Sequence, residues 1–173
     1  SATGRLTKIK ASIDDQGTIH ALDYDQIDDV GAYPRAPEPA SLYRMHGNLS
    51  GAYKVKNIRC RNRVILTNKT PSGLNRGFGG PQHYFALERL VHQIAVELKL
   101  NVLDVIKINL LEKNQFPYKS PSGALLDSGN FQKLVKKVIE SSTYKKILKN
   151  KNDSVKNGKI YGIGYSAIIE PSI

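Results

Sequence analysis

Strict alternation of apolar and polar residues marks the first part of the chain. From Ile9 to Ile13 every second residue is apolar and the residues between them are polar, which predicts a half-buried strand over residues 6–13. Residues 14–17, Asp-Asp-Gln-Gly, have the composition of a tight turn, and residues 18–25 have the pattern of a returning strand. We therefore expect a β-hairpin here.

The next segment combines irregular and strand-like sequence. Three prolines between positions 34 and 39 exclude regular structure there, and residues 42–50 are compatible with a short helix or with a turn. The runs 52–58 and 60–67 are rich in apolar and β-branched residues, which predicts two more strands.

Helical spacing replaces alternation after Pro81. A proline suits the first position of a helix because the N–H that it lacks would be unpaired there anyway. A second helix is expected at 102–111, with Asn101 as its N-cap and Asp104 in its first turn. The residues expected on the buried side of the first helix are Phe85, Leu87, Val91, Ile94 and Leu98.

The remaining pattern predicts two more helices and a strand. A third helix begins after Asp127 or Ser128, and a lysine-rich fourth helix covers 143–149. A turn at 157–158, Asn-Gly, leads into a glycine-bearing strand at 159–165. The residues expected to be buried in the third helix are Phe131, Leu134, Val135, Val138 and Ile139.

Strands followed by helices and a last strand indicate an α+β fold. We divide the chain into a mainly strand region at 1–80, a helical region at 81–157 and a strand at 158–173 that begins another lobe. The last strand has no partner in its own part of the sequence, so we expect it to complete a sheet with another chain.

Composition suits an ordinary cytoplasmic protein. Of its 173 residues 40% are hydrophobic and 24% charged. No apolar run approaches the roughly 20 residues that cross a bilayer, and Ser1 to Arg5 lack the apolar region of a secretory signal. A single cysteine, Cys60, excludes an internal disulfide and a multi-cysteine metal site, and we expect it to be half-buried in a strand. We expect no membrane partner.

The net charge of +11 raises the question of a nucleic-acid partner. Between Phe131 and Ile160 nine lysines are accompanied by only two acidic residues, Glu140 and Asp153. These lysines surround an apolar stripe, as on a solvated helix face, and the region lacks arginine and has few aromatic residues for base stacking. We do not expect nucleic-acid binding, and the alternative function is a non-catalytic basic module that binds nucleic acid or an acidic protein.

The loop before the first helix carries the clearest candidate chemistry. Arg76-Gly77-Phe78-Gly79-Gly80-Pro81-Gln82 combines three glycines, which let backbone N–H groups approach a ligand, with the N-terminus of a helix. Arg76 can donate to an oxygen-rich group, and Gln82 offers an amide. Phe78 is either a plug that packs on the following helix or one wall of a pocket for a flat substrate. The spacing fits neither a dinucleotide fingerprint nor a P-loop.

The four histidines, at positions 20, 46, 83 and 92, are too scattered for a metal site. Only His83 lies near the loop, and we expect it to pack with Tyr84 at the start of the helix. We therefore expect no protein ligand for a metal.

Residues 67–82, Thr-Asn-Lys-Thr-Pro-Ser-Gly-Leu-Asn followed by the loop, resemble a segment of one enzyme family. The family is that of the molybdenum-cofactor-binding (large) subunits of xanthine dehydrogenase, aldehyde oxidase and carbon monoxide dehydrogenase. Counterparts occur in order on both sides, at Asp29–Tyr33, Ala52–Arg59, Glu88–Arg89 and Asp127–Phe131. The resemblance therefore covers nearly the whole chain.

This resemblance implies a hydroxylase that inserts a water-derived oxygen at an activated carbon of an aldehyde, a purine-like heterocycle or a similar small organic substrate. The implied cofactor is a molybdenum-pterin in its cytosine dinucleotide form, shared with other chains. Electrons would pass through 2Fe-2S clusters to FAD in partner subunits. The implied partners are therefore the remaining portions of the molybdenum subunit, an iron–sulfur subunit and an FAD subunit.

The resemblance also implies roles for individual residues. Phe78 would contact substrate at the molybdenum site, and Gln82 would lie beside the pterin at the start of the helix. Arg44, nine residues before Tyr53, is the candidate for a catalytic arginine that steadies negative charge on the substrate, or else a surface arginine in a connection. The pterin dithiolene would hold the metal. The implied cofactor-binding residues are Arg76, Gly77, Phe78, Gly79, Gly80 and Gln82.

Two elements of the family's active site are missing from this sequence. The family's general base is a glutamate in a G-x-G-E context, whereas Gly162-Ile163-Gly164 is followed here by Tyr165. The family's upstream G-G-G-F-G-G segment is also missing. The sequence therefore predicts a middle portion of the subunit, active only when other polypeptides supply the rest.

Overall fold

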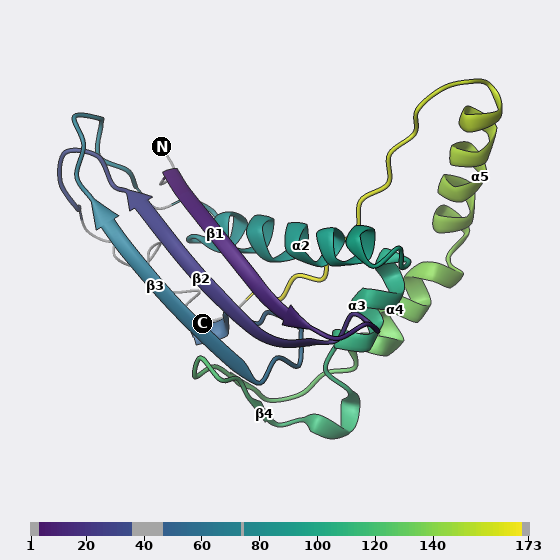
Figure 1. Ribbon diagram of the computed structural model, residues 1–173, viewed down its shortest axis with the longest axis horizontal. Coiled ribbons are helices and arrows are strands. Elements are labelled where there is room, and N and C mark those ends of the chain that lie inside the picture. Colours follow the sequence, from purple (N-terminus) through teal and green to yellow (C-terminus); the bar gives the residue numbers. More distant parts are fainter. Residues whose placement is uncertain (1–3, 36–46, 74, 171–173) are drawn as a thin grey trace.

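A three-stranded sheet with helix α2 (Gly80–Glu97) packed across one face forms the centre of the molecule (Figure 1). β1 (Gly4–Ile13) pairs antiparallel with β2 (Ile19–Asp29), and β2 pairs parallel with β3 (Asn57–Ile65). This mixture of sheet and helices confirms the α+β class. The computed structural model describes residues 4–35, 47–73 and 75–170.

The expected hairpin is present, but one expected strand is not. Gly17 takes the left-handed conformation, with φ of 83°, where the chain turns between β1 and β2. Residues 52–56 form no strand beyond one bridge between Tyr53 and Leu110. The predicted strand at 52–58 is therefore wrong for residues 52–56, whereas residues 57 and 58 belong to β3 together with most of the strand predicted at 60–67. The backbone there is held by the end of α3 (Val102–Asn109), because the Lys54 N–H donates to the last carbonyl of that helix at 2.7 Å.

The first two helices form where the pattern places them. α2 spans Gly80–Glu97 with its proline at the start, and the side chain of Asn101 caps α3 by accepting from the Leu103 N–H at 2.8 Å. After α3 come the 3-10 turn η2 (Lys113–Gln115) and a two-stranded ribbon of β4 (Tyr118–Lys119) and β5 (Leu125–Leu126). α4 (Phe131–Glu140) and α5 (Ser142–Lys156) follow.

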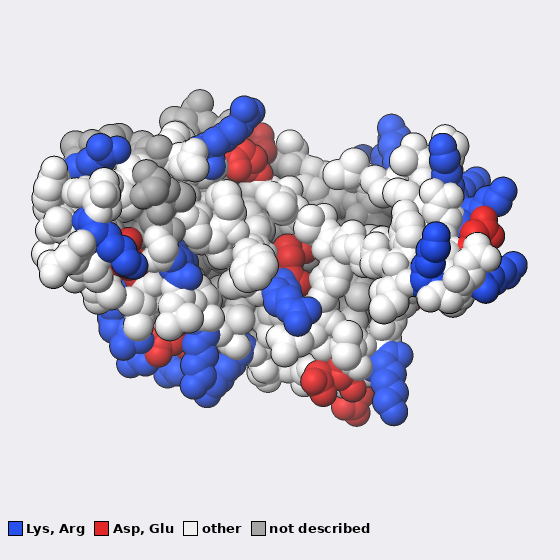
Figure 2. All heavy atoms as spheres, turned by 90° about the horizontal axis from the view of Figure 1, so that it is seen from above, with Lys and Arg blue, Asp and Glu red and all other residues white. Residues whose placement is uncertain are grey.

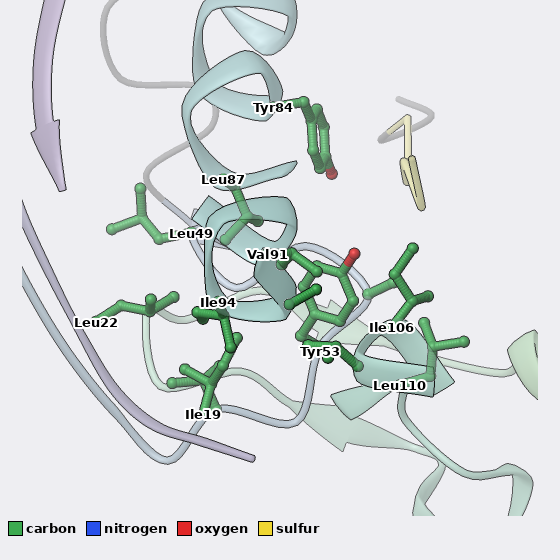
Figure 3. Packing of buried hydrophobic residues seen from close by; sticks show 14 of the residues in the cluster. Ile19, Leu22, Leu49, Tyr53, Tyr84, Leu87, Val91, Ile94, Ile106 and Leu110 are labelled. Atoms are coloured by element: carbon green, nitrogen blue, oxygen red, sulfur yellow. The ribbon is translucent and has the colours of Figure 1, made fainter. Parts of the chain in front are cut away.

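The core lies between the sheet, α2 and α3 (Figure 3). Leu87, Val91 and Ile94 of α2 are buried there, as expected, and Leu98 is half-buried. Phe85 is instead 77% exposed, so its predicted burial is wrong. It lies two residues before Leu87 and therefore roughly 160° around the helix from it, since each residue turns an α-helix by about 100°.

The third helix, α4, is less buried than its pattern suggests. No residue of α4 or α5 is buried. Phe131, Val135 and Ile139 are half-buried, whereas Leu134 and Val138 are 61% and 53% exposed, so the predicted burial of the whole apolar side of α4 is wrong. The reason is visible in Figure 1, where α4 and α5 extend away from the sheet.

The last described segment is extended, but residues 159–170 form no strand with another described segment, so the strand predicted at 159–165 is present only as extended chain. From Tyr161 to Glu170 half-buried and exposed residues alternate, and the segment returns from the end of α5 to pass alongside α2 (Figure 1). The expectation that it completes a sheet with another chain stays a prediction. In the described part of the chain, no helix is both long and apolar enough to span a membrane.

Candidate cofactor site

The approach to the glycine loop is tied to the end of β2 through Asp29. Its carboxylate accepts hydrogen bonds from Lys69 Nζ at 2.5 Å, from Thr67 Oγ1 at 2.6 Å and from the Gly31 N–H at 3.0 Å. These three donors lower the pKa of Asp29 to about 2. The carboxylate is therefore ionised at neutral pH and holds both segments together.

Backbone hydrogen bonds add to the contacts of Asp29, and together they anchor the start of the loop on the end of β2. The Ser72 N–H donates to the Val30 carbonyl and the Ala32 N–H to the Lys69 carbonyl, both at 3.0 Å. Gly31 allows the close approach, because a Cβ built there would lie 2.6 Å from the Thr70 carbonyl oxygen. Its φ of 79° also lies in the left-handed region that favours glycine.

Three successive residues of the loop take left-handed conformations. Gly77, Phe78 and Gly79 have φ values of 87°, 42° and 85°, and Gly79 is the N-cap of α2. The turn is closed by bonds from the Phe78 N–H to the Asn75 carbonyl at 3.0 Å and from the Gly80 N–H to the Gly77 carbonyl at 2.7 Å. Among the described residues, no acceptor lies within hydrogen-bonding distance of the N–H groups of Gly77 and Gly79. Free N–H groups beside a helix N-terminus suit an anionic group.

The structure brings some of the predicted cofactor residues together and separates others. Arg76, Gly77 and Gly80 line a cavity of about 890 Å³ between the loop, α2 and the last described segment. Gln82 lines a different groove, of about 850 Å³, between β1 and α2. Phe78 is half-buried and, with Gly79, lines neither of these two spaces.

Arg44, the predicted catalytic arginine, lies outside the described residues. Within residues 4–35, 47–73 and 75–170, no group of three or more His, Cys, Asp and Glu side chains is placed to bind a metal ion. Groups that could hold an anionic cofactor include the Arg76 side chain and the backbone of the loop, and Arg89 lines the same cavity.

Sequence reasoning missed a carboxylate in the wall of the large cavity. Glu88 is only 6% exposed, and burial raises the pKa of its side chain to about 7. It accepts from the Tyr53 hydroxyl, 3.0 Å from each carboxylate oxygen, and from the Ala167 N–H at 2.9 Å. The sequence signal that could have found Glu88 is its position on the apolar side of α2, one turn from Tyr84 and one turn from His92.

Aromatic rings pack at the start of α2 as predicted. His83 is fully buried, with ring centroids 5.6 Å from Tyr24 and 5.2 Å from Tyr84. Burial raises the pKa of Tyr84 to about 12, so its hydroxyl stays protonated and can donate. Cys60 is half-buried in β3, which confirms its expected place, and burial raises the pKa of its thiol.

The lysines of the last two helices do not form a single binding face. Figure 2 shows basic side chains projecting on several sides at the end of the molecule where α5 lies. The cofactor loop begins α2 and is separate in the chain from these lysines. This arrangement is that of a solvated helix.

Sequence comparison matches residues 1–110 to the molybdopterin cofactor-binding domain. The carbon monoxide dehydrogenase large chain of Hydrogenophaga pseudoflava is 28% identical over 134 residues, which are 74% of this chain and 16% of that protein. The nicotine 6-hydroxylase large subunit of Paenarthrobacter nicotinovorans is 26% identical over 175 aligned positions, 99% of this chain and 20% of that protein. The alternative of a basic nucleic-acid or acidic-protein binder finds no support in these relatives.

Structural comparison gives the same fold. Quinoline 2-oxidoreductase from Pseudomonas putida 86 superposes with a TM-score of 0.79 at 24% identity, over 91% of this chain and 20% of that one. The chain therefore spans about one fifth of the length of the proteins that it matches. The matched domain contains the anchor on β2, the left-handed loop and all of α2. On these grounds the chain belongs to the molybdopterin cofactor-binding family, that of the large chains of carbon monoxide dehydrogenase and xanthine dehydrogenase-type oxidoreductases.

Proposed function

We propose that this chain forms one wall of the molybdenum-pterin site of a hydroxylase. The observation that carries the proposal is the left-handed run from Gly77 to Gly79 directly before the N-terminus of α2. Within the described part of the chain, this run leaves the N–H groups of Gly77 and Gly79 available to an oxygen-rich anion. When bound, a molybdenum-pterin supplies the oxidising and oxygen-transferring chemistry that hydroxylates an activated carbon.

The parts proposed for Arg76 and Gly77 are supported by their geometry. Arg76 is exposed and lines the 890 Å³ cavity, where its guanidinium can donate to oxygens of the cofactor. Gly77 lets the loop backbone lie close to Pro81, because a Cβ there would lie 2.9 Å from Pro81 Cδ. The N-terminus of α2 adds positive potential beside these groups. Phe78 against the substrate, Gln82 beside the pterin and Arg44 as the catalytic arginine belong to the same proposal.

The general base belongs to another part of the assembly in this proposal. Glu88 and Glu170 are the carboxylates that line the cavity among the described residues. Glu88 already accepts from Tyr53 and from the Ala167 N–H, so its oxygens are engaged in holding the fold. Because Tyr165 stands where the family has the glutamate of its G-x-G-E segment, further portions of the molybdenum subunit would supply the base and close the cavity.

Partners and substrate follow from the same proposal. Relatives named as large chains or large subunits support an assembly with further subunits, for which we propose an FAD subunit and a 2Fe-2S subunit in the cytoplasm. Relatives named nicotine 6-hydroxylase and aldehyde oxidase support a small N-heterocycle or aldehyde as the substrate. The cytosine dinucleotide form of the pterin is proposed on the resemblance alone.

The test is cofactor retention in the complete complex that contains this chain. We expect molybdenum and a pterin dinucleotide after extraction, and a loss on the order of tenfold in both for Gly77→Ala, because forced backbone strain costs about 1–3 kcal/mol. Gly158→Ala is the matched control, since Gly158 also has a positive φ, 69°, but has no atom within 4 Å of a built Cβ. A complex free of molybdenum and pterin would overturn the proposal, as would full occupancy in Gly77→Ala.

A further inference from the structure

The last described segment forms one side of a ladder whose other side consists of α2 side chains. Three polar residues of α2, each one turn from the next, bond to the backbone of every second residue of the segment. The segment runs antiparallel to the helix. The pairs are Tyr84 with Ile169, Glu88 with Ala167 and His92 with Tyr165.

Each of the three pairs in this ladder has one bond of 2.7–2.9 Å, and the Tyr84 and His92 pairs each add a longer one of 3.3 Å. The Tyr84 hydroxyl donates to the Ile169 carbonyl at 2.7 Å, and His92 Nε2 lies 2.7 Å from the Tyr165 carbonyl. Four residues of helix rise about 6 Å and two residues of strand about 6.6–6.8 Å, so successive rungs stay aligned. α2 therefore holds the segment in the conformation of a strand without a neighbouring strand.

This arrangement leaves the opposite backbone edge open. In an extended chain successive residues direct their N–H and C=O groups to opposite sides. The backbone N–H and C=O groups of Tyr165, Ala167 and Ile169 point toward α2. Those of Ser166 and Ile168 therefore point away from it. Within the described residues, the backbone groups of Ser166 and Ile168 make no hydrogen bond. An open edge of this kind is a template for a further strand.

An apolar groove lies beside the segment. It has a volume of about 560 Å³ and is lined by residues 163–169 on one side and by side chains of α3, α4 and α5 on the other. Leu134 and Val138 of α4, which line it, are 61% and 53% exposed. No charged side chain of the described residues lines it. A strand seated there would therefore need apolar residues facing α4.

We propose that the open edge at Ser166 and Ile168 pairs with an apolar β-strand from the part of the molybdopterin-binding subunit that lies outside this chain. The identity of this occupant rests on the proposed function. This chain covers about 20% of the length of its relative nicotine 6-hydroxylase large subunit, so a whole subunit of that kind has many further strands to offer. The open edge is also continuous with the cofactor site, because Ser166 and Ile168 line the same cavity as Arg76 and Gly77. A polypeptide that completes the cofactor site thus reaches this edge.

Amide hydrogen exchange tests the pairing directly. The complete complex is compared with the 173-residue chain alone, with exchange resolved for single amides. We expect the amides of Ser166 and Ile168 to exchange at least about tenfold more slowly in the complex, since ladder hydrogen bonds protect amides. The Ala167 amide, bonded to Glu88, is the internal reference and should be protected in both samples. Unchanged exchange at 166 and 168 in the complex overturns the proposal.

Proline variants separate pairing from folding. Ser166→Pro removes an N–H that points away from α2, and proline is tolerated on a strand edge. We therefore expect unchanged thermal unfolding of the chain alone. Assembly with the rest of the subunit should be at least about tenfold weaker, because a hydrogen bond to the added strand is lost. Ala167→Pro removes the N–H that Glu88 accepts and should destabilise the chain alone. Ser166→Pro that assembles normally contradicts the pairing.

Two further readouts identify the occupant. Sedimentation of the chain alone reports self-association. A dimer in which the Ser166 and Ile168 amides are protected would show that the added strand comes from a second copy of this chain, which would overturn the proposal. Molybdenum and pterin are measured in the same complex. Protected amides without cofactor would overturn the proposed function while the pairing stands, and cofactor without protection would do the reverse.

Discussion

The Tyr53 hydroxyl lies 3.0 Å from both carboxylate oxygens of Glu88 inside the core. Tyr53 is fully buried, and Glu88 also accepts from the Ala167 N–H at 2.9 Å. One carboxylate thus joins the segment before β3, helix α2 and the last described segment. A buried carboxylate is costly unless donors surround it, and here those donors come from distant parts of the chain.

Stability should depend on pH through Glu88. Burial raises the pKa of its side chain from 4.5 to about 7 in the folded protein. The folded state therefore binds the proton more tightly, and the stabilisation is complete below pH 4.5 and is lost as pH rises through 7. We expect the free energy of unfolding to fall by up to about 3 kcal/mol across this window, measured by urea denaturation.

The variant Glu88→Gln isolates this contribution, because the amide keeps an acceptor but does not titrate. Its unfolding free energy should lack the decline that the wild-type chain shows between pH 5 and 8. Glu112→Gln is the control, since Glu112 is exposed and its bond from Lys54 lowers the pKa of that carboxyl. An equal decline in Glu88→Gln and wild type would refute the assignment.

Replacement of Gly31 should detach the loop from β2. In Gly31→Ala the new Cβ would lie 2.6 Å from the Thr70 carbonyl oxygen, at a φ of 79°. We expect a loss of about 2 kcal/mol or more in unfolding free energy, from strain and a displaced backbone. Gly123→Ala has a similarly positive φ, 109°, but no atom within 4 Å, and should cost less. Equal losses in thermal denaturation would argue against a steric role for Gly31.

The buried ion pair between Arg5 and Asp28 should matter more than the exposed pair between Arg59 and Asp23. Arg5 Nε lies 2.6 Å from Asp28 Oδ1, with side chains 3% and 0% exposed, whereas the Arg59 side chain is 80% exposed. Asp28→Ala takes this carboxylate from a buried guanidinium and should cost about 3–5 kcal/mol. Asp23→Ala should change stability little. Chemical denaturation of both variants checks the ranking, and similar losses would contradict it.

Phe85 and Leu87 should separate assembly from folding. Leu87 is fully buried, so Leu87→Ala should destabilise the chain by about 2–5 kcal/mol. Phe85 is 77% exposed and lines the cavity beside the loop, so Phe85→Ala should leave the unfolding free energy nearly unchanged. It should instead weaken assembly with the rest of the subunit, measured by copurification of tagged chains. Normal assembly of Phe85→Ala would show that this ring faces solvent in the complex.

Local pattern predicted the hairpin and the first two helices well. Alternation in β1, the proline at the start of α2 and the N-cap at Asn101 act over a few residues, so no distant contact is needed to recognise them. The expected strand at 52–58 failed because its backbone bonds to the end of α3, more than 50 residues away. Burial of α4 failed because an apolar face does not say whether its partner lies in the same chain.

The candidate site was predicted in part for the same reason. Glycine spacing indicated an anion-binding loop, and the left-handed run at Gly77–Gly79 agrees with it, because that conformation depends on the residues themselves. Sequence could not place Gln82 in a groove apart from Arg76, since that depends on how α2 lies on β1. Arg44 lies outside the described residues, so its role stays a prediction.

The sequence by itself determined the strand and helix periods, the glycine loop before α2 and the family, since these depend on residue types and short spacings. Only the tertiary structure decided that Tyr53, Glu88 and Ala167 meet. It also decided that Phe85 is exposed and that Ser166 and Ile168 present an open edge. Burial, a raised pKa and an unpaired backbone arise from contacts between segments far apart in the chain, which no local pattern encodes.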